Sequence, residues 1–87
     1  MNGFRAEKLS KSGATLLRLS GRIEAEYIPQ LKVEIEAEPL VTCLDLDHVK
    51  LLSSEVLAFL DTCERQGIEL RNCPPYIREW ITAQRSS

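Results

Sequence analysis

Hydrophobic and polar residues alternate along the first part of the chain in the pattern of two β-strands. Phe4 to Leu9 and Ala14 to Ser20 are separated by Ser10-Lys11-Ser12-Gly13, where serines and a glycine are typical of a turn. In the second segment Leu17 and Leu19 alternate with polar neighbours, which indicates a strand with one buried face. The pattern predicts an opening β-hairpin.

The spacing then changes from that of a strand to that of a helix. We expect the second strand to end at Gly21. Ile28, Leu31 and Ile35 then follow at intervals of three and four residues, which is helical spacing. Such intervals place these three side chains on one face, which should point to the core. Pro39 should close this first helix.

A compact apolar run from Val41 to Leu46 predicts a buried central strand, and Asp47-His48 after it indicates a turn or loop. A second helix should begin near Ser54 and end at Gly67, a residue suited to the left-handed conformation that ends helices. Its apolar stripe consists of Val56, Leu57, Leu60 and Cys63.

The last part of the chain predicts a short edge strand and a third helix. Ile68 to Arg71 alternates apolar and charged residues, and Pro74-Pro75 prevents the strand from continuing. Apolar residues then recur at helical spacing from Tyr76 to Ala83. The order β-β-α-β-α-β-α predicts an α/β fold with a mixed, mostly parallel four-stranded sheet and about three helices.

Length and composition fit a single domain over residues 1–87, with 44% apolar and 28% charged residues. A formal net charge of −2 leaves no broad basic surface for a nucleic-acid backbone, so we expect no nucleic-acid partner. No apolar run approaches the roughly 20 residues that span a bilayer. The first residues do not form a signal-peptide core, so we expect no membrane insertion and a cytoplasmic location.

Residues that could carry chemistry are few. Cys43, Cys63 and Cys73 are odd in number and widely spaced, with only His48 as an imidazole partner, so we expect neither a metal site nor a disulfide framework. The arginines late in the chain should simply be solvated.

Asp45 and Asp47 would share one side of a continuous strand, as a carboxylate pair for acid–base work could. No nucleophile, glycine-rich phosphate loop or second histidine completes such a site. The sequence therefore predicts no enzyme, no catalytic residue and no cofactor.

Two serines, Ser53 and Ser54, stand where the predicted central strand leads into the second helix. A hydroxyl at a helix N-terminus can cap the helix, and either serine could do so. A phosphorylated serine there would instead place an anion at the positive end of the helix dipole. From these residues alone, both interpretations stay open.

Four segments carry a resemblance to a known family: Leu17 to Glu24, Leu44 to Leu60, Gly67 to Leu70 and Cys73 to Trp80. In their order and spacing they resemble the STAS domain, the fold shared by bacterial anti-sigma-factor antagonists and the cytoplasmic tails of sulphate transporters. The resemblance covers nearly the whole chain and implies that the last strand and last helix usual in the family are missing.

In anti-sigma-factor antagonists the loop after the third strand usually ends as Asp-Ser-Ser-Gly or Asp-Ser-Thr-Gly, and the partner kinase phosphorylates the first hydroxyl residue after the Asp. The matching residues here are Ser53-Ser54-Glu55-Val56. Ser54 takes the phosphoserine position, while Ser53 replaces the aspartate, Glu55 the second hydroxyl and Val56 the glycine. Glu55 adds a fixed negative charge that would repel a phosphate or partly imitate one.

The resemblance implies a non-catalytic interaction module that binds an anti-sigma factor, a serine kinase or another bacterial regulatory protein. Its partner-binding surface would comprise Ser53, Ser54, Glu55 and Val56, with phosphorylation at Ser54 as the control. A first alternative is a phosphorylation-independent STAS subunit of a bacterial lipid-transport ABC complex, which Glu55 and Val56 favour. A second is a small nucleotide-binding domain, because a fold does not fix function.

Overall fold

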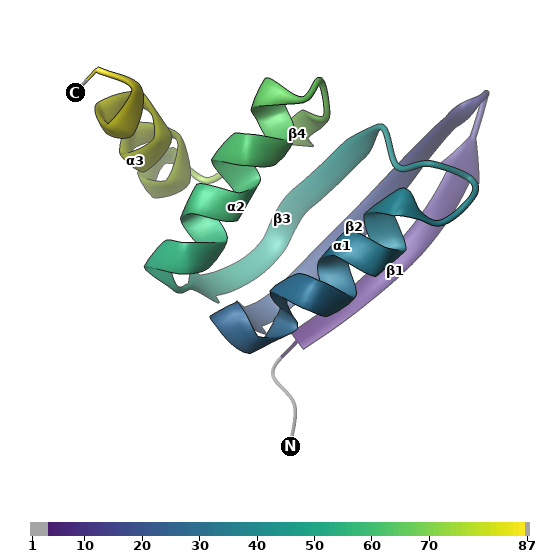
Figure 1. Ribbon diagram of the computed structural model, residues 1–87, viewed down its shortest axis with the longest axis horizontal. Coiled ribbons are helices and arrows are strands. Elements are labelled where there is room, and N and C mark those ends of the chain that lie inside the picture. The colour runs from purple at the N-terminus through teal and green to yellow at the C-terminus, as the bar shows by residue number, and fades with distance from the viewer. Residues whose placement is uncertain (1–3, 87) are drawn as a thin grey trace.

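A computed structural model describes residues 4–86 as a four-stranded mixed sheet with three α-helices (Figure 1). This confirms the predicted α/β class and the predicted order of elements. In chain order the elements are β1 (Phe4–Lys11), β2 (Ala14–Ile23), the short 3-10 helix η1 (Ala25–Tyr27), α1 (Ile28–Glu36), β3 (Cys43–Leu52), α2 (Ser54–Arg65), β4 (Glu69–Arg71) and α3 (Pro75–Arg85).

The strands lie in the order β1-β2-β3-β4. β1 pairs with β2 in an antiparallel hairpin, whereas β2 with β3 and β3 with β4 are parallel pairs. Parallel neighbours require crossover connections, which α1 and α2 provide. Both crossover helices lie on the same face of the sheet (Figure 1).

The hydrophobic core fills the space between this face and the helices. Alternate residues of β2 and β3 point into it, and Leu31 of α1 meets them there with no exposed surface. Ile28 and Ile35 are half-buried at its margin. All four residues of the predicted stripe on α2 are buried, and Gly67 has the expected left-handed backbone with φ +101°.

Three strands are longer than their sequence pattern indicates. β1 continues past Leu9 to Lys11, so Ser10 and Lys11 belong to the strand and not to the turn. β2 continues through Gly21 to Ile23, so the expectation that it ends at Gly21 is wrong. β3 continues to Leu52 and contains Asp47 and His48, which were expected in a turn. Register shifts between β2 and β3 near both places let the ladder continue, and Gly21 supplies the positive φ of +86° at one of them.

α3 lies beside α2 and away from the sheet, as Figure 1 shows. Ile77 and Ile81 anchor it in the core with no exposed surface. At the surface, both Nη atoms of Arg78 donate to the Glu64 carboxylate at 2.9 Å. Arg85 donates to Glu64 at 2.9 Å and to Asp61 at 2.8 Å. These arginines therefore join two helices, a role that the expectation of plain solvation missed.

The contacts between α2 and α3 depend on an ionised Glu64. Hydrogen bonds from Arg78 hold the pKa of this carboxyl below its usual range against the opposing effect of burial, and the charge of Arg85 adds to the lowering. Because the folded pKa is lowered, the resulting stability is present above the ordinary carboxyl pKa of about 4 and is lost as pH falls through the folded value.

Replacing Glu64 by Gln should lower the free energy of unfolding at pH 7 by roughly 1 kcal/mol or less, because the network is partly solvated. The difference from the wild type should shrink at pH 3, because stability that comes from a lowered carboxyl pKa is lost as pH falls toward the folded value. Urea unfolding at both values measures it. Glu79→Gln, at an exposed residue of α3 outside this network, is the control and should change little. An equal loss at both pH values would contradict this account.

Candidate functional site

The junction between β3 and α2 positions the serines singled out in the sequence. Ser53 has an extended backbone with φ −76° and ψ 163°, and its hydroxyl oxygen accepts a hydrogen bond from the Val56 N–H at 3.4 Å. Its carbonyl oxygen accepts the Leu57 N–H at 3.0 Å. Ser53 is therefore the N-cap of α2.

Ser54 is the first residue of α2 and its side chain is exposed. Its hydroxyl lies 3.5 Å from a carboxylate oxygen of Glu55, to which it donates. Glu55 is exposed as well. Since Ser53 caps the helix, the Ser54 hydroxyl has no capping role and faces solvent at the positive end of the helix dipole.

Val56 lies on the other side of the helix and is completely buried. It belongs to the same core cluster as Leu60, one helical turn further along. Val56 therefore offers no side-chain surface to a partner, which corrects its placement in the expected partner-binding surface. Of that surface, Ser54 and Glu55 are exposed and Ser53 is half-buried.

The surroundings of Ser53 include residues that the sequence did not single out. A hollow of about 180 Å³ beside it is lined by residues from the ends of β2 and β3, among them Arg22 and Leu51, which are partners in the ladder. Leu51 is 53% exposed, unusual for a large apolar side chain, and Arg22 is exposed too. Only the continuation of both strands past their expected ends brings these two side chains together.

The two aspartates do not form an acid–base pair. Asp45 is 7% exposed, whereas Asp47 is exposed. Burial works to raise the pKa of the Asp45 carboxyl, but hydrogen bonds from Asn72, the Asp47 N–H and Arg18 together hold it below its usual value. Asp45 is thus ionised at neutral pH and cannot act as a general acid.

The three cysteines are free thiols, with Cys43 and Cys63 buried and Cys73 half-buried. Burial raises the pKa of Cys63 to about 11, so its thiol stays protonated at neutral pH. Within residues 4–86 no group of three or more His, Cys, Asp or Glu side chains could hold a metal ion.

Comparison of the sequence with known protein families finds no match, and comparison with curated proteins finds none either. Over the part of the chain that the structure describes, no helix is both long enough and apolar enough to cross a membrane.

Ser53 and Ser54 have different structural roles, which alanine substitution can separate. Ser53→Ala removes the cap of α2 and should lower the free energy of unfolding by about 1 kcal/mol. Ser54→Ala is the matched control and should change it little, because this hydroxyl bonds only an exposed neighbour. Denaturant unfolding of both variants measures the difference. A larger loss from Ser54→Ala would assign the cap to Ser54 instead.

Proposed function

We propose that this chain is a STAS-like domain that acts by binding a partner protein and not by catalysis, in the manner of an anti-sigma-factor antagonist. The observation that carries the proposal is the division of roles between the two serines. Ser53 satisfies the helix N-terminus, and Ser54 remains exposed at the position where the resembling family carries its phosphoserine. The order of strands and helices is compatible with such a fold.

The exposed surface at the junction has the chemistry of a protein contact. Leu51 offers apolar area in the hollow, and Arg22 and Glu24, which also line it, carry charges of opposite sign. A partner can bury Leu51 while it pairs with these charges, which is how an apolar centre and a polar rim combine at interfaces. The partner would be a kinase-type anti-sigma factor, and the chain would act in the cytoplasm.

Phosphorylation of Ser54 would change this surface by electrostatics. It adds between one and two negative charges directly beside Glu55. Burying such a doubly acidic site under a partner carries a large desolvation cost, so the modified protein would be released. The inward position of Val56 supports the proposal, because its branched side chain does not obstruct the surface where the family carries glycine.

The second candidate is the phosphorylation-independent subunit of a lipid-transport ABC complex. Glu55 favours this candidate. Its carboxylate accepts a hydrogen bond from the Ser54 hydroxyl and provides a permanent negative charge at the start of α2. In that case the surface would be set for binding without modification, and its partner would be the ATPase of the complex.

Incubation with a cognate anti-sigma kinase and ATP tests the main proposal. Phosphopeptide mapping by mass spectrometry should find phosphate on Ser54 in the wild type. Ser54→Ala should abolish the modification, and Ser12→Ala, at another exposed serine, should not affect it. Phosphate on another residue, or none at all, would contradict the phosphoswitch.

Affinity capture from the source cell separates the two candidates. Under the main proposal the wild type and Ser54→Ala should capture the anti-sigma factor, and Ser54→Asp should capture at least fivefold less, because added charge opposes docking. Equal capture of an ABC ATPase by the wild type and Ser54→Asp would favour the second candidate.

A further inference from the structure

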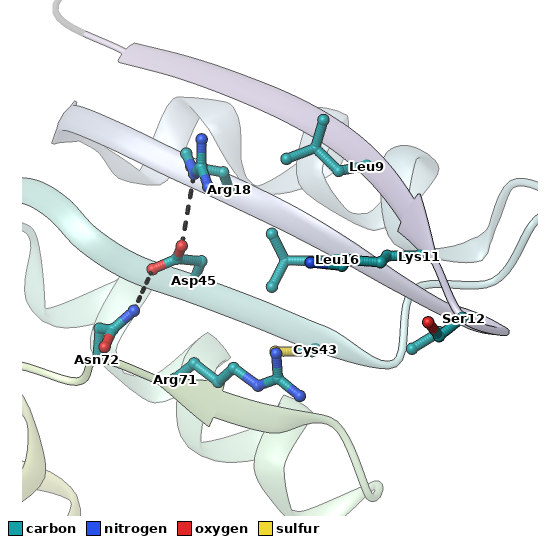
Figure 2. Close-up of a pocket in the computed structure, with 10 residues that line it drawn as sticks. Leu9, Lys11, Ser12, Leu16, Arg18, Cys43, Asp45, Arg71 and Asn72 are labelled. Atoms are coloured by element: carbon teal, nitrogen blue, oxygen red, sulfur yellow. Dashed lines mark hydrogen bonds and ion pairs between the residues drawn. The ribbon is translucent and has the colours of Figure 1, made fainter.

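The face of the sheet opposite α1 and α2 contains a second hollow, of about 620 Å³ (Figure 2). No helix of the described chain covers this face in Figure 1. The hollow lies near the amino end of β3, whereas Ser54 follows the carboxyl end of that strand. It is therefore separate from the proposed docking surface.

The floor of the hollow is an apolar strip that crosses three strands. Leu9 of β1 pairs with Leu16 of β2, and Leu16 pairs with Cys43 of β3. Side chains that are direct partners in neighbouring strands stand side by side on one face. The strip spans about 10 Å from β1 to β3, given the usual spacing of strands.

Cationic side chains surround this strip. Lys11, Arg18 and Arg71 line the hollow together with the carboxylate of Asp45, and Glu69, which pairs with Arg71, adds a second carboxylate nearby, so the three cations exceed the two acids by one. The whole chain, in contrast, has a net charge of −2. The hollow is thus a local basic site on an acidic protein, with an apolar floor.

Two of the cations are held in place by neighbouring acids. Arg18 donates through Nε to Asp45 at 3.4 Å, and Asn72 donates to the other oxygen of that carboxylate at 3.0 Å. Arg71 donates through Nε to Glu69 at 3.3 Å, and its guanidinium extends over Cys43 in Figure 2. Both bonds use Nε, so the Nη groups of these arginines are available to an added anion.

Lys11 is exposed and forms no ion pair with any residue in the described range. The described residues that line the hollow include no aromatic side chain, so the stacking platforms that hold nucleic-acid bases are missing. The volume is within the range of small-molecule sites. These features fit an aliphatic ligand with an acidic group.

We propose that this hollow binds a free amphiphilic carboxylate. Its aliphatic chain would lie on Leu9, Leu16 and Cys43, where apolar surface is removed from water. Its carboxylate would bind Arg71 and Lys11, and Arg71 would offer the paired donors that suit a carboxylate. Arg18 would remain with Asp45 and border the site.

An NMR titration of the isotopically labelled chain with decanoate tests this proposal. The decanoate concentration is kept below the value at which micelles form. Decanoate should shift the amide signals of Leu9, Leu16 and Cys43 in a saturable way. Decanol should bind several-fold more weakly, and decyltrimethylammonium more weakly still, because they lack the negative charge.

Lys11→Gln and Arg71→Gln should each weaken decanoate binding about threefold, because each removes one partly exposed ion pair, and should leave decanol binding unchanged. Lys32→Gln, at an exposed residue of α1, is the control for net charge and should not change decanoate binding.

Several results would overturn the proposal. Equal affinity for decanol and decanoate would show that the cations do not select the ligand. Signal shifts confined to the helical face would place the site elsewhere. Binding to anionic phospholipid vesicles without binding of free decanoate would make the face a membrane contact. Self-association through the open face, detected by sedimentation without ligand, would make a second copy the occupant.

Discussion

The parallel pairing of β3 with both β2 and β4 is the interaction on which the rest of this structure depends. β3 pairs with β2 on one side and with β4 on the other, and its residues Leu44 and Leu46 are buried in the core beneath the helices. Parallel pairing also requires that the chain cross over between strands, and both crossover helices lie on one face. The two faces of the sheet consequently meet different environments, and the side chains of every strand are divided between them.

This asymmetry explains why a buried carboxylate is tolerated in the central strand. Asp45 is on the face without helices, and its burial would be costly if it had no partners. Arg18 of β2, the Asp47 N–H of β3 and Asn72 after β4 all donate to it, so one carboxylate ties three strands together. The same cluster fixes Arg18 at the border of the basic hollow, so a stabilising contact also shapes a surface.

Local sequence patterns were sufficient to predict the order of elements, the apolar stripe on α2 and the helix end at Gly67, because each of these features depends on residues that are close in the sequence. The ends of β2 and β3 were not predictable in this way. Both strands are extended by their pairing with each other, which continues across two register shifts to Ile23 and Leu52. The Arg78–Glu64 contact is likewise long-range. Val56 is instructive: helical spacing placed it correctly in the core, whereas the resemblance to a known motif placed it on a surface.

The length of β3 also decides which serine is exposed. The N–H of Ser53 donates to the carbonyl of Ile23 at 3.2 Å, so the sheet holds this residue and the helix begins one residue later. The Val56 N–H donates to the Ser53 hydroxyl, and Val56 and Leu60, four residues apart, lie on the face of α2 that is buried in the core. The hydrogen bond to Ile23 thus holds Ser53 at the end of the sheet, where its side chain caps α2. With Ser53 as the cap, the Ser54 hydroxyl is left exposed on the first turn of α2.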